Sequence, residues 1–285
     1  MSEPAGLAGG FSRFRVDFAY DGTDFNGWAK QPKLRTVQGD LLKVLEQIFG
    51  PTENDFAMRV AGRTDAGVHA DHQVCHFDLS PQQQKRLGRT PLTATRLNNL
   101  LPPDIAVHSV ALAADGFDAR FSAIGRSYKY LITDGACMPN PKRARYALSV
   151  KKELDIDLMQ QATKFLLGLR DFGAFCKPRE GATTIRDLRT LTVTRQPDNA
   201  IEVFLEADAF CHNMVRSIVG ALIAAGEGKA SPDDVAEKLA KRTRVGSYKV
   251  QPAQGLTLIE IGYPADDELE AQAERARNMR TLDEN

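Results

Sequence analysis

The sequence lacks the features that mark exported, membrane-spanning and disulfide-rich proteins. Its 285 residues include only four cysteines, which lie far apart without C-x-x-C spacing, so neither a zinc ribbon nor a disulfide framework is indicated. The N-terminus has no basic segment followed by an apolar run, and no run of about 18 apolar residues occurs anywhere. We therefore expect a cytoplasmic protein with no membrane span, whose four thiols are reduced and packed as small apolar groups.

The sequence also lacks net charge, with 37 basic and 37 acidic residues, but the charges are unevenly distributed. Residues 120–152 hold eight Lys or Arg and one acid, whereas residues 266–285 hold seven acids and three arginines. A basic face carrying Tyr128, Tyr130 and Tyr146 would suit RNA, because cations neutralise phosphates and aromatic rings stack on unpaired bases. A solvated strand and loop would explain the same charges, so both interpretations stay open.

Hydrophobic periodicity predicts the order β-α-β-β-α-β in the first half of the chain. Alternating apolar residues indicate a half-buried first strand, and Thr36 is a candidate N-cap for the first helix. The predicted strands span residues 13–20, 56–60, 72–78 and 105–112, and the predicted helices span residues 36–49 and 93–100.

The second half repeats the same order, with one additional helix that begins with Ser231 as N-cap and Pro232 at the first helical position. We therefore predict an α+β fold of two ferredoxin-like halves, set side by side around a central antiparallel or mixed sheet with an active-site cleft between them. The predicted domains are residues 1–115 and 116–265, followed by a charged tail over residues 266–285. The predicted strands span residues 126–134, 188–195, 200–207 and 256–263, and the predicted helices span residues 155–169, 212–225 and 231–242.

The segment "RVAGRTDAGVHADHQVCHFD", residues 59–78, places a glycine-bounded loop between two predicted strands. Gly62 and Gly67 allow backbone angles that a Cβ would forbid, so the loop can turn sharply and present Arg63, Thr64 and Asp65. Asp65 is then a candidate catalytic carboxylate. Alternatively, Asp65 forms an Asx turn and Arg63 is an ordinary surface charge.

The same segment raises the alternative of a metal-dependent hydrolase, because His69, His72 and His76 are three of only five histidines. His72 and His76 would lie on one face of a strand but roughly 13 Å apart, which is too far for one ion without a bulge. No H-E-x-x-H motif is present. A metal site is therefore the less favoured interpretation.

A single arginine, Arg216, interrupts the apolar stripe of the predicted helix 212–225. A partly buried guanidinium needs an anionic partner, because an unpaired buried charge is costly. Asp65 is one candidate, and an arginine held against it would keep the carboxylate ionised and aimed. Exposure to solvent or a pair with Asp208 explains Arg216 equally well.

Seven segments together resemble one known family, the tRNA pseudouridine synthase A family, and the resemblance extends over about residues 13–264. It implies isomerisation of uridine to pseudouridine in the anticodon stem-loop of tRNA, at position 38, 39 or 40, by a homodimer that uses no cofactor and no metal. The segments that carry the resemblance are "YDGTDFNGW", "AGRTDAGVHA", "NLLPPDIAV", "FDARFSAIGRSYKYLI", "DFGAFC", "AFCHNMVRSIVGAL" and "PAQGLTL".

The resemblance also assigns roles to individual residues. It implies that Asp65 is the catalytic aspartate, that Arg63 helps to extrude the target nucleotide, and that Arg216 pairs with Asp65. Tyr128 matches the tyrosine that lies against the target base and helps to remove the C5 proton. Two departures, Ala29 after the Trp and Cys211 in place of the usual Leu, touch none of these groups. A non-catalytic RNA-binding protein on the same scaffold is the alternative.

Overall fold

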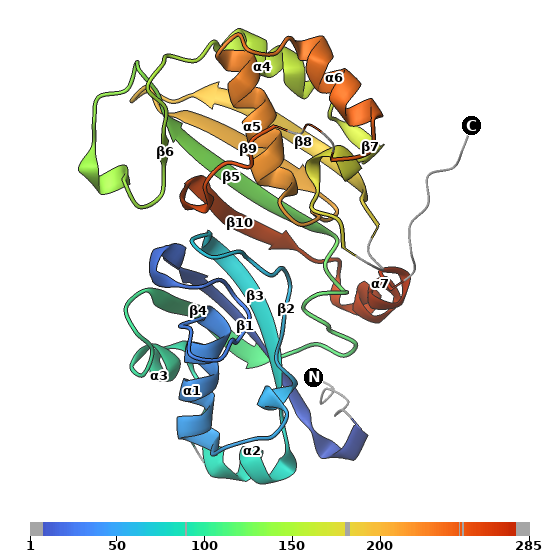
Figure 1. Cartoon of the computed structure of the whole chain (residues 1–285). Helices are drawn as coiled ribbons and strands as arrows, with labels where there is room; N and C mark the ends of the chain where they lie inside the picture. Colours follow the sequence, from blue (N-terminus) through green and yellow to red (C-terminus); the bar gives the residue numbers. More distant parts are fainter. Residues whose placement is uncertain (1–7, 89, 180–182, 245, 247, 278–285) are drawn as a thin grey trace. The chain divides into compact units, whose positions relative to one another are not determined.

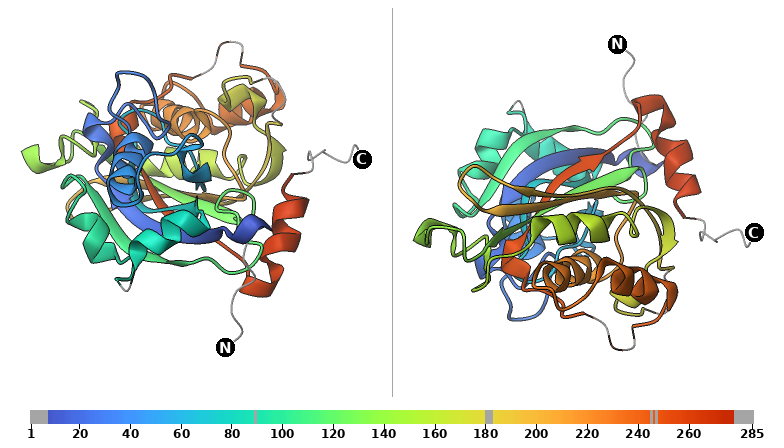
Figure 2. Two further views of the ribbon diagram at one scale, coloured as in Figure 1. Left: turned by 90° about the horizontal axis from the view of Figure 1, so that it is seen from below. Right: turned by 90° about the horizontal axis from the view of Figure 1, so that it is seen from above.

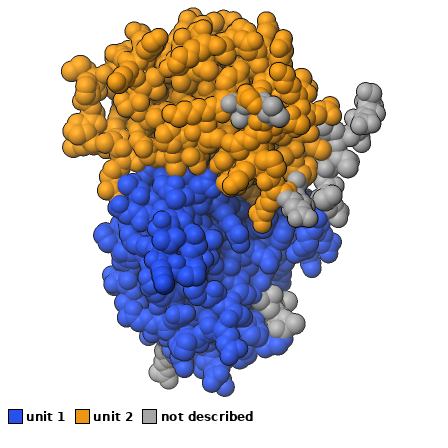
Figure 3. Space-filling view, viewed as in Figure 1, with its two compact units in different colours: residues 1–124, 259–278 blue, residues 125–258, 279–285 orange. Residues whose placement is uncertain are grey.

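The chain forms an α+β fold that divides into two compact units, coloured separately in Figure 3. The computed structural model describes residues 8–88, 90–179, 183–244, 246 and 248–277. The first unit comprises the described residues up to Ile124 together with those from Ile259 onward, and the second comprises Gly125–Leu258. The chain therefore enters the second unit at Gly125 and returns to the first within strand β10 (Leu256–Gly262).

The first unit contains every element of the predicted β-α-β-β-α-β order, with one further helix, α2, between the third strand and the second predicted helix (Figure 1). Its antiparallel strands follow the order β4-β1-β3-β2 in the sheet. The elements are β1 (Ser12–Tyr20), α1 (Val37–Phe49), β2 (Arg59–Val60), β3 (His69–Leu79), α2 (Pro81–Leu87), α3 (Ala94–Asn98) and β4 (Ile105–Leu112).

Strand β1 has one face in the core and one polar face. Phe14, Val16, Phe18 and Tyr20 are buried, and the intervening residues are more exposed, as alternation along a strand requires. Helix α1 begins where predicted, because the Thr36 hydroxyl accepts a hydrogen bond from the Gly39 N–H at 3.2 Å.

Helix α2 is absent from the sequence-based prediction, although a capping box starts it. The Ser80 hydroxyl accepts from the Gln83 N–H while the Gln83 side chain accepts from the Ser80 N–H. None of its residues is buried, so it has no apolar stripe for a periodicity search to detect.

The second unit contains a mixed sheet covered by helices α4 and α5, which pack on each other (Figure 2). Its antiparallel strands follow the order β5-β9-β8-β7, and β6 pairs with β5 in parallel. None of the helices in the described ranges is long and apolar enough to cross a membrane. The elements, besides the start of β10, are β5 (Gly125–Thr133), β6 (Leu148–Ser149), α4 (Ile156–Thr163), β7 (Gly168–Asp171), β8 (Ile185–Arg195), β9 (Ile201–Ala207), α5 (Met214–Gly226) and α6 (Pro232–Ala240).

The helix predicted over residues 155–169 is shorter in the structure and ends at Thr163. It starts where predicted, because the Asp155 carboxylate caps it by accepting a hydrogen bond from the Leu158 N–H at 3.0 Å. Gly168 has a φ of 87°, a conformation that no helix interior can contain, and strand β7 begins there. Leu169 is consequently 45% exposed on β7, so the prediction that the helix extends to residue 169 is wrong.

Part of the predicted tail packs on the first unit as helix α7 (Leu269–Arg275). Leu269 is buried, and its carbonyl accepts a hydrogen bond from the Ser122 hydroxyl at 3.0 Å. Residues 278–285 of that tail lie outside the described part of the chain.

A buried histidine holds the segment that leads out of the first unit. His76 on β3 is 2% exposed, and its Nδ1 accepts a hydrogen bond from the Ala119 N–H at 3.0 Å. Burial, reinforced by the nearby Arg13 charge, lowers the pKa of His76 to about 4. The imidazole is therefore neutral at pH 7, as an acceptor from a backbone N–H must be.

This depressed pKa predicts that acid weakens the first unit. Between an unfolded pKa of about 6.5 and the folded value of about 4, the unfolded chain binds a proton that the folded chain does not. The free energy of unfolding should therefore be about 2 kcal/mol lower at about pH 5 than at a pH above the unfolded pKa of His76. Urea unfolding followed by fluorescence of Trp28, the only tryptophan and a buried residue of this unit, measures the change.

The comparison with two variants identifies the titrating group. His76→Gln should flatten the stability profile between about pH 7.5 and pH 5, whereas His108→Gln, at an exposed position of β4, should leave it unchanged. A wild-type profile that persists in His76→Gln would show that another group titrates.

Candidate active site

The Arg63–Asp65 loop joins β2 to β3 in the first unit, as the sequence predicts. Arg63 is exposed, Thr64 is buried and Asp65 is partly exposed. The Asp65 carbonyl accepts from the Val68 N–H at 3.2 Å, which closes a turn in which Gly67 has a φ of 80°. The predicted need for glycine at position 67 is confirmed, and this turn places the carboxylate of Asp65 at its first position.

The segment of residues 20–28 contacts this loop through backbone hydrogen bonds. The Trp28 N–H donates to the Thr64 carbonyl at 3.0 Å, and the Gly67 N–H donates to the Phe25 carbonyl at 3.3 Å. Gly27 has a φ of 87°, and a Cβ on it would lie 2.9 Å from the Thr64 oxygen. Two segments that carry the family resemblance are thus in direct backbone contact.

Tyr128 lies in the middle of β5, opposite Leu205 of β9. It is 8% exposed, and its ring packs edge-on against Phe210 with 5.1 Å between centroids. The strand and this aromatic contact fix the plane of the phenol ring, which is what a residue that stacks on a base requires.

Arg216 lies in the first turn of α5, after Asn213, whose φ is 68°. Its Nε donates to the Gln251 carbonyl at 2.6 Å, and its own carbonyl accepts from the Gln251 N–H at 3.1 Å. The Nε end of the Arg216 guanidinium is therefore fixed by the backbone of Gln251. Asp208, named above as an alternative partner, accepts from the Asp187 N–H at 2.7 Å. Of the predicted site residues, Arg63 and Asp65 lie in the first unit, and Tyr128 and Arg216 lie in the second.

The three histidines considered as metal ligands have separate hydrogen-bond partners. His69 Nδ1 accepts from the Gly22 N–H at 3.0 Å, His72 Nε2 lies 3.0 Å from a carboxylate oxygen of Asp17, and His76 accepts from Ala119. Across the described ranges, no three His, Cys, Asp or Glu side chains gather in a way that could hold a metal ion.

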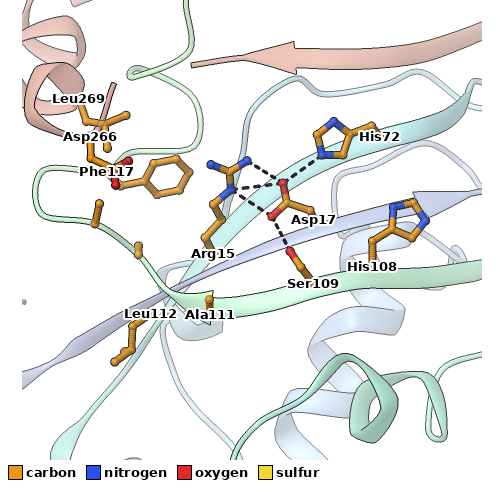
Figure 4. A pocket seen from close by; sticks show the side chains of 12 residues that line it. Arg15, Asp17, His72, His108, Ser109, Ala111, Leu112, Phe117, Asp266 and Leu269 are labelled. Atoms are coloured by element: carbon orange, nitrogen blue, oxygen red, sulfur yellow. Dashed lines mark hydrogen bonds and ion pairs between the residues drawn. The ribbon is translucent and has the colours of Figure 1, made fainter. Parts of the chain in front are cut away.

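A cavity of about 570 Å³ lies on the polar face of the first sheet, opposite the buried side chains of β1 (Figure 4). Asp17 lies at its centre and accepts hydrogen bonds from Arg15 at 2.7 Å, His72 at 3.0 Å and Ser109 at 2.9 Å. Burial alone would raise the pKa of Asp17, but these three bonds hold it well below its usual range. The Asp17 carboxylate is already satisfied by protein groups, so it is not a candidate for catalysis.

Two cysteines are paired, contrary to the expectation of four reduced thiols. Cys176 and Cys211 form a disulfide with their Cα atoms 5.7 Å apart, whereas Cys75 and Cys137 are free. The Lys177 N–H donates to the His212 carbonyl at 2.9 Å beside the disulfide. The expectation is wrong for this pair because tertiary folding joins segments 35 residues apart, which spacing along the chain does not reveal.

The predicted basic face carries fewer aromatic rings than expected. Tyr130 is fully buried and Tyr128 nearly so, and only Tyr146, at 42%, is substantially exposed. Lys142 and Arg145 are exposed beside it. Of the three tyrosines named from sequence, Tyr146 alone lies on an open surface.

The close contact between residues 20–28 and the loop generates a stability prediction. A Cβ on Gly22 would overlap the Val68 carbonyl, so Gly22→Ala should lower the free energy of unfolding by about 2 kcal/mol or more. Gly88→Ala is the control, because Gly88 has a φ of 56° but open space around it, and strain alone costs about 1–2 kcal/mol. Urea unfolding followed by Trp28 fluorescence compares the two. A smaller loss in Gly22→Ala than in Gly88→Ala would contradict the close approach.

Comparison with known proteins identifies the family. A family model described as tRNA pseudouridine synthase matches residues 162–264. The tRNA pseudouridine synthase A of Leifsonia xyli is 46% identical over 283 positions, covering 95% of this chain and 98% of the relative. Those of Streptomyces avermitilis and Bifidobacterium longum are 46% and 42% identical, covering 96% and 95% of this chain and 95% and 100% of the relatives. The chain therefore belongs to the tRNA pseudouridine synthase family and is an isomerase.

Proposed function

We propose that this enzyme converts uridine to pseudouridine in the anticodon stem-loop of tRNA, at one or more of positions 38, 39 and 40, with Asp65 as nucleophile. The observation that carries the proposal is the Asp65 turn, in which a partly exposed carboxylate follows an exposed arginine on a loop held by backbone contacts. The near full-length similarity to synthases of this family supports the reaction.

The reaction breaks the bond between N1 of uracil and C1′ of ribose and forms a bond between C5 and C1′, so the C5 proton must leave. Nothing is oxidised or reduced, and protein side chains can supply every group. The Asp65 carboxylate attacks the nucleotide at the base or the sugar, or acts through a glycal route, and each course lets the detached uracil turn before it is rejoined. Tyr128 lies against the base and helps to remove the C5 proton.

Two arginines complete the proposed site. Arg63 is exposed next to Asp65, and its planar guanidinium is suited to occupy the place of an extruded nucleotide. Arg216 pairs with the Asp65 carboxylate and orients it toward the target nucleotide. Support for this pair comes from the apolar stripe around Arg216 and from the backbone bond that fixes its Nε.

The remaining parts of the proposal follow the family. The enzyme acts as a homodimer in the cytoplasm, where its tRNA substrate is found, and the tRNA contacts both protomers. Light scattering of the purified protein should give twice the chain mass of 31.4 kDa. A monomer that catalyses the reaction at the full rate would contradict the proposed dimer.

The first test is release of tritium from C5 of uracil in a labelled tRNA transcript. The wild type should release tritium and Asp65→Asn should release none, because the amide is not a nucleophile at this step. Asp71→Asn, which changes an exposed carboxylate six residues later, should retain activity. Circular dichroism and tRNA binding establish that Asp65→Asn is folded.

The same assay tests the partner of Asp65. Arg216→Gln should reduce the rate at least 100-fold, whereas Arg216→Lys should retain more activity because it keeps the positive charge. Equal losses in both would argue against a charge role. No release by the wild type from transcripts with uridine at positions 38–40, together with binding that is lost in Lys142→Glu/Arg145→Glu, would favour a non-catalytic RNA-binding protein.

A further inference from the structure

Buried side chains from two strands hold both neighbours of Arg63. Gln73 on β3 is fully buried, and its Nε2 donates to the Gly62 carbonyl at 2.8 Å. The hydroxyl of Tyr20, at the end of β1, lies 2.8 Å from the hydroxyl of Thr64. The residues before and after Arg63 are therefore each held by a hydrogen bond from a different buried side chain.

The two bonds belong to one network. Gln73 Nε2 also lies 3.4 Å from the Tyr20 hydroxyl oxygen. An amide nitrogen can only donate, so the Tyr20 oxygen accepts from it and its own hydrogen is left for Thr64. Burial raises the pKa of Tyr20 to about 12, against the smaller effect of its hydrogen bonds, so the phenol keeps this hydrogen at neutral pH. Gln73 Oε1 accepts from the Val74 N–H at 3.2 Å.

The backbone geometry brings the two side chains together. Gln73 pairs with Phe18 of β1, but Tyr20 pairs with Ala70, so the register of the two strands shifts between Phe18 and Tyr20. Irregularities of this kind redirect side chains and are common beside active sites. The shift lies directly next to the Arg63–Asp65 loop.

Apolar residues in place of Tyr20 and Gln73 would stabilise the core about as well as these polar groups do. The Tyr20 ring already packs against Phe18 and Phe25, with centroids 6.0 and 6.5 Å away, and needs no hydroxyl for that. A buried amide or hydroxyl carries a desolvation cost that its hydrogen bonds only offset. What these hydrogen bonds achieve is a fixed position of the Arg63–Asp65 loop.

We propose that Tyr20 and Gln73 are positioning residues for the reaction. They hold Gly62 and Thr64 and thereby place Arg63 and Asp65 against the target nucleotide. This inference rests on the function proposed above. Attack by a carboxylate depends steeply on its placement, and displacement by about 1 Å can cost about 100-fold in rate.

The test compares Tyr20→Phe with Tyr263→Phe in steady-state tritium release at a temperature where both remain folded by Trp28 fluorescence. Each variant loses one tyrosine hydroxyl from the first unit. The Tyr263 hydroxyl donates to the Ala119 carbonyl at 2.6 Å, and neither residue belongs to the Arg63–Asp65 loop. Tyr20→Phe should lower kcat at least tenfold with little change in KM, and Tyr263→Phe should leave kcat within twofold of the wild type.

A double-mutant cycle assigns the effect to the bond itself. If Tyr20 acts through Thr64, then Thr64→Val in the Tyr20→Phe background should lower kcat no further than either single variant. If the losses of kcat in Tyr20→Phe and Thr64→Val multiply in the double variant, the inference is overturned. It is also overturned if the wild type is active and Tyr20→Phe has the same kcat as Tyr263→Phe. Both outcomes leave the proposed function standing. Absence of release by the wild type would remove the proposed function and this inference with it.

Discussion

Backbone contact between residues 20–28 and the Arg63–Asp65 loop is the constraint on which the proposed chemistry depends. The Thr64 carbonyl accepts from Trp28, Gly67 donates to Phe25, and Gly22 approaches Val68 too closely for a side chain. These contacts couple the position of the loop to that of residues 20–28. An exposed loop that carries a nucleophile would otherwise be free to sample many positions, and its rate would suffer accordingly.

Three buried polar side chains of strand β3 bond to irregular backbone of the first unit. His76 accepts from Ala119, His69 accepts from Gly22, and Gln73 donates to Gly62. Each of these side chains comes from the regular strand β3 and satisfies a backbone group that no ladder reaches. Strand β3 thus acts as a rigid support for three loops, and the neutral state of His76 makes that support sensitive to acid.

The second unit uses comparable means to hold its own site residues. Arg216 is bonded at Nε by the Gln251 carbonyl, and the segment before α5 is tied by the Cys176–Cys211 disulfide and the Lys177–His212 backbone bond. Tyr128 is fixed by β5 and by its contact with Phe210. Each candidate side chain therefore projects from an element whose backbone is fixed independently of it, which is the arrangement that precise catalysis requires.

The sequence by itself determined most of the long strands and helices, several helix starts and the chemical identity of the candidate site. Alternation along β1 and the cap at Thr36 are local patterns, and they are visible without the fold. Only the tertiary structure decided the end of α4 at Thr163, the Cys176–Cys211 pair and the partners of Tyr20 and Gln73. The physical reason is distance along the chain: Tyr20 and Thr64 are 44 residues apart, and no periodic pattern encodes which buried polar groups will meet.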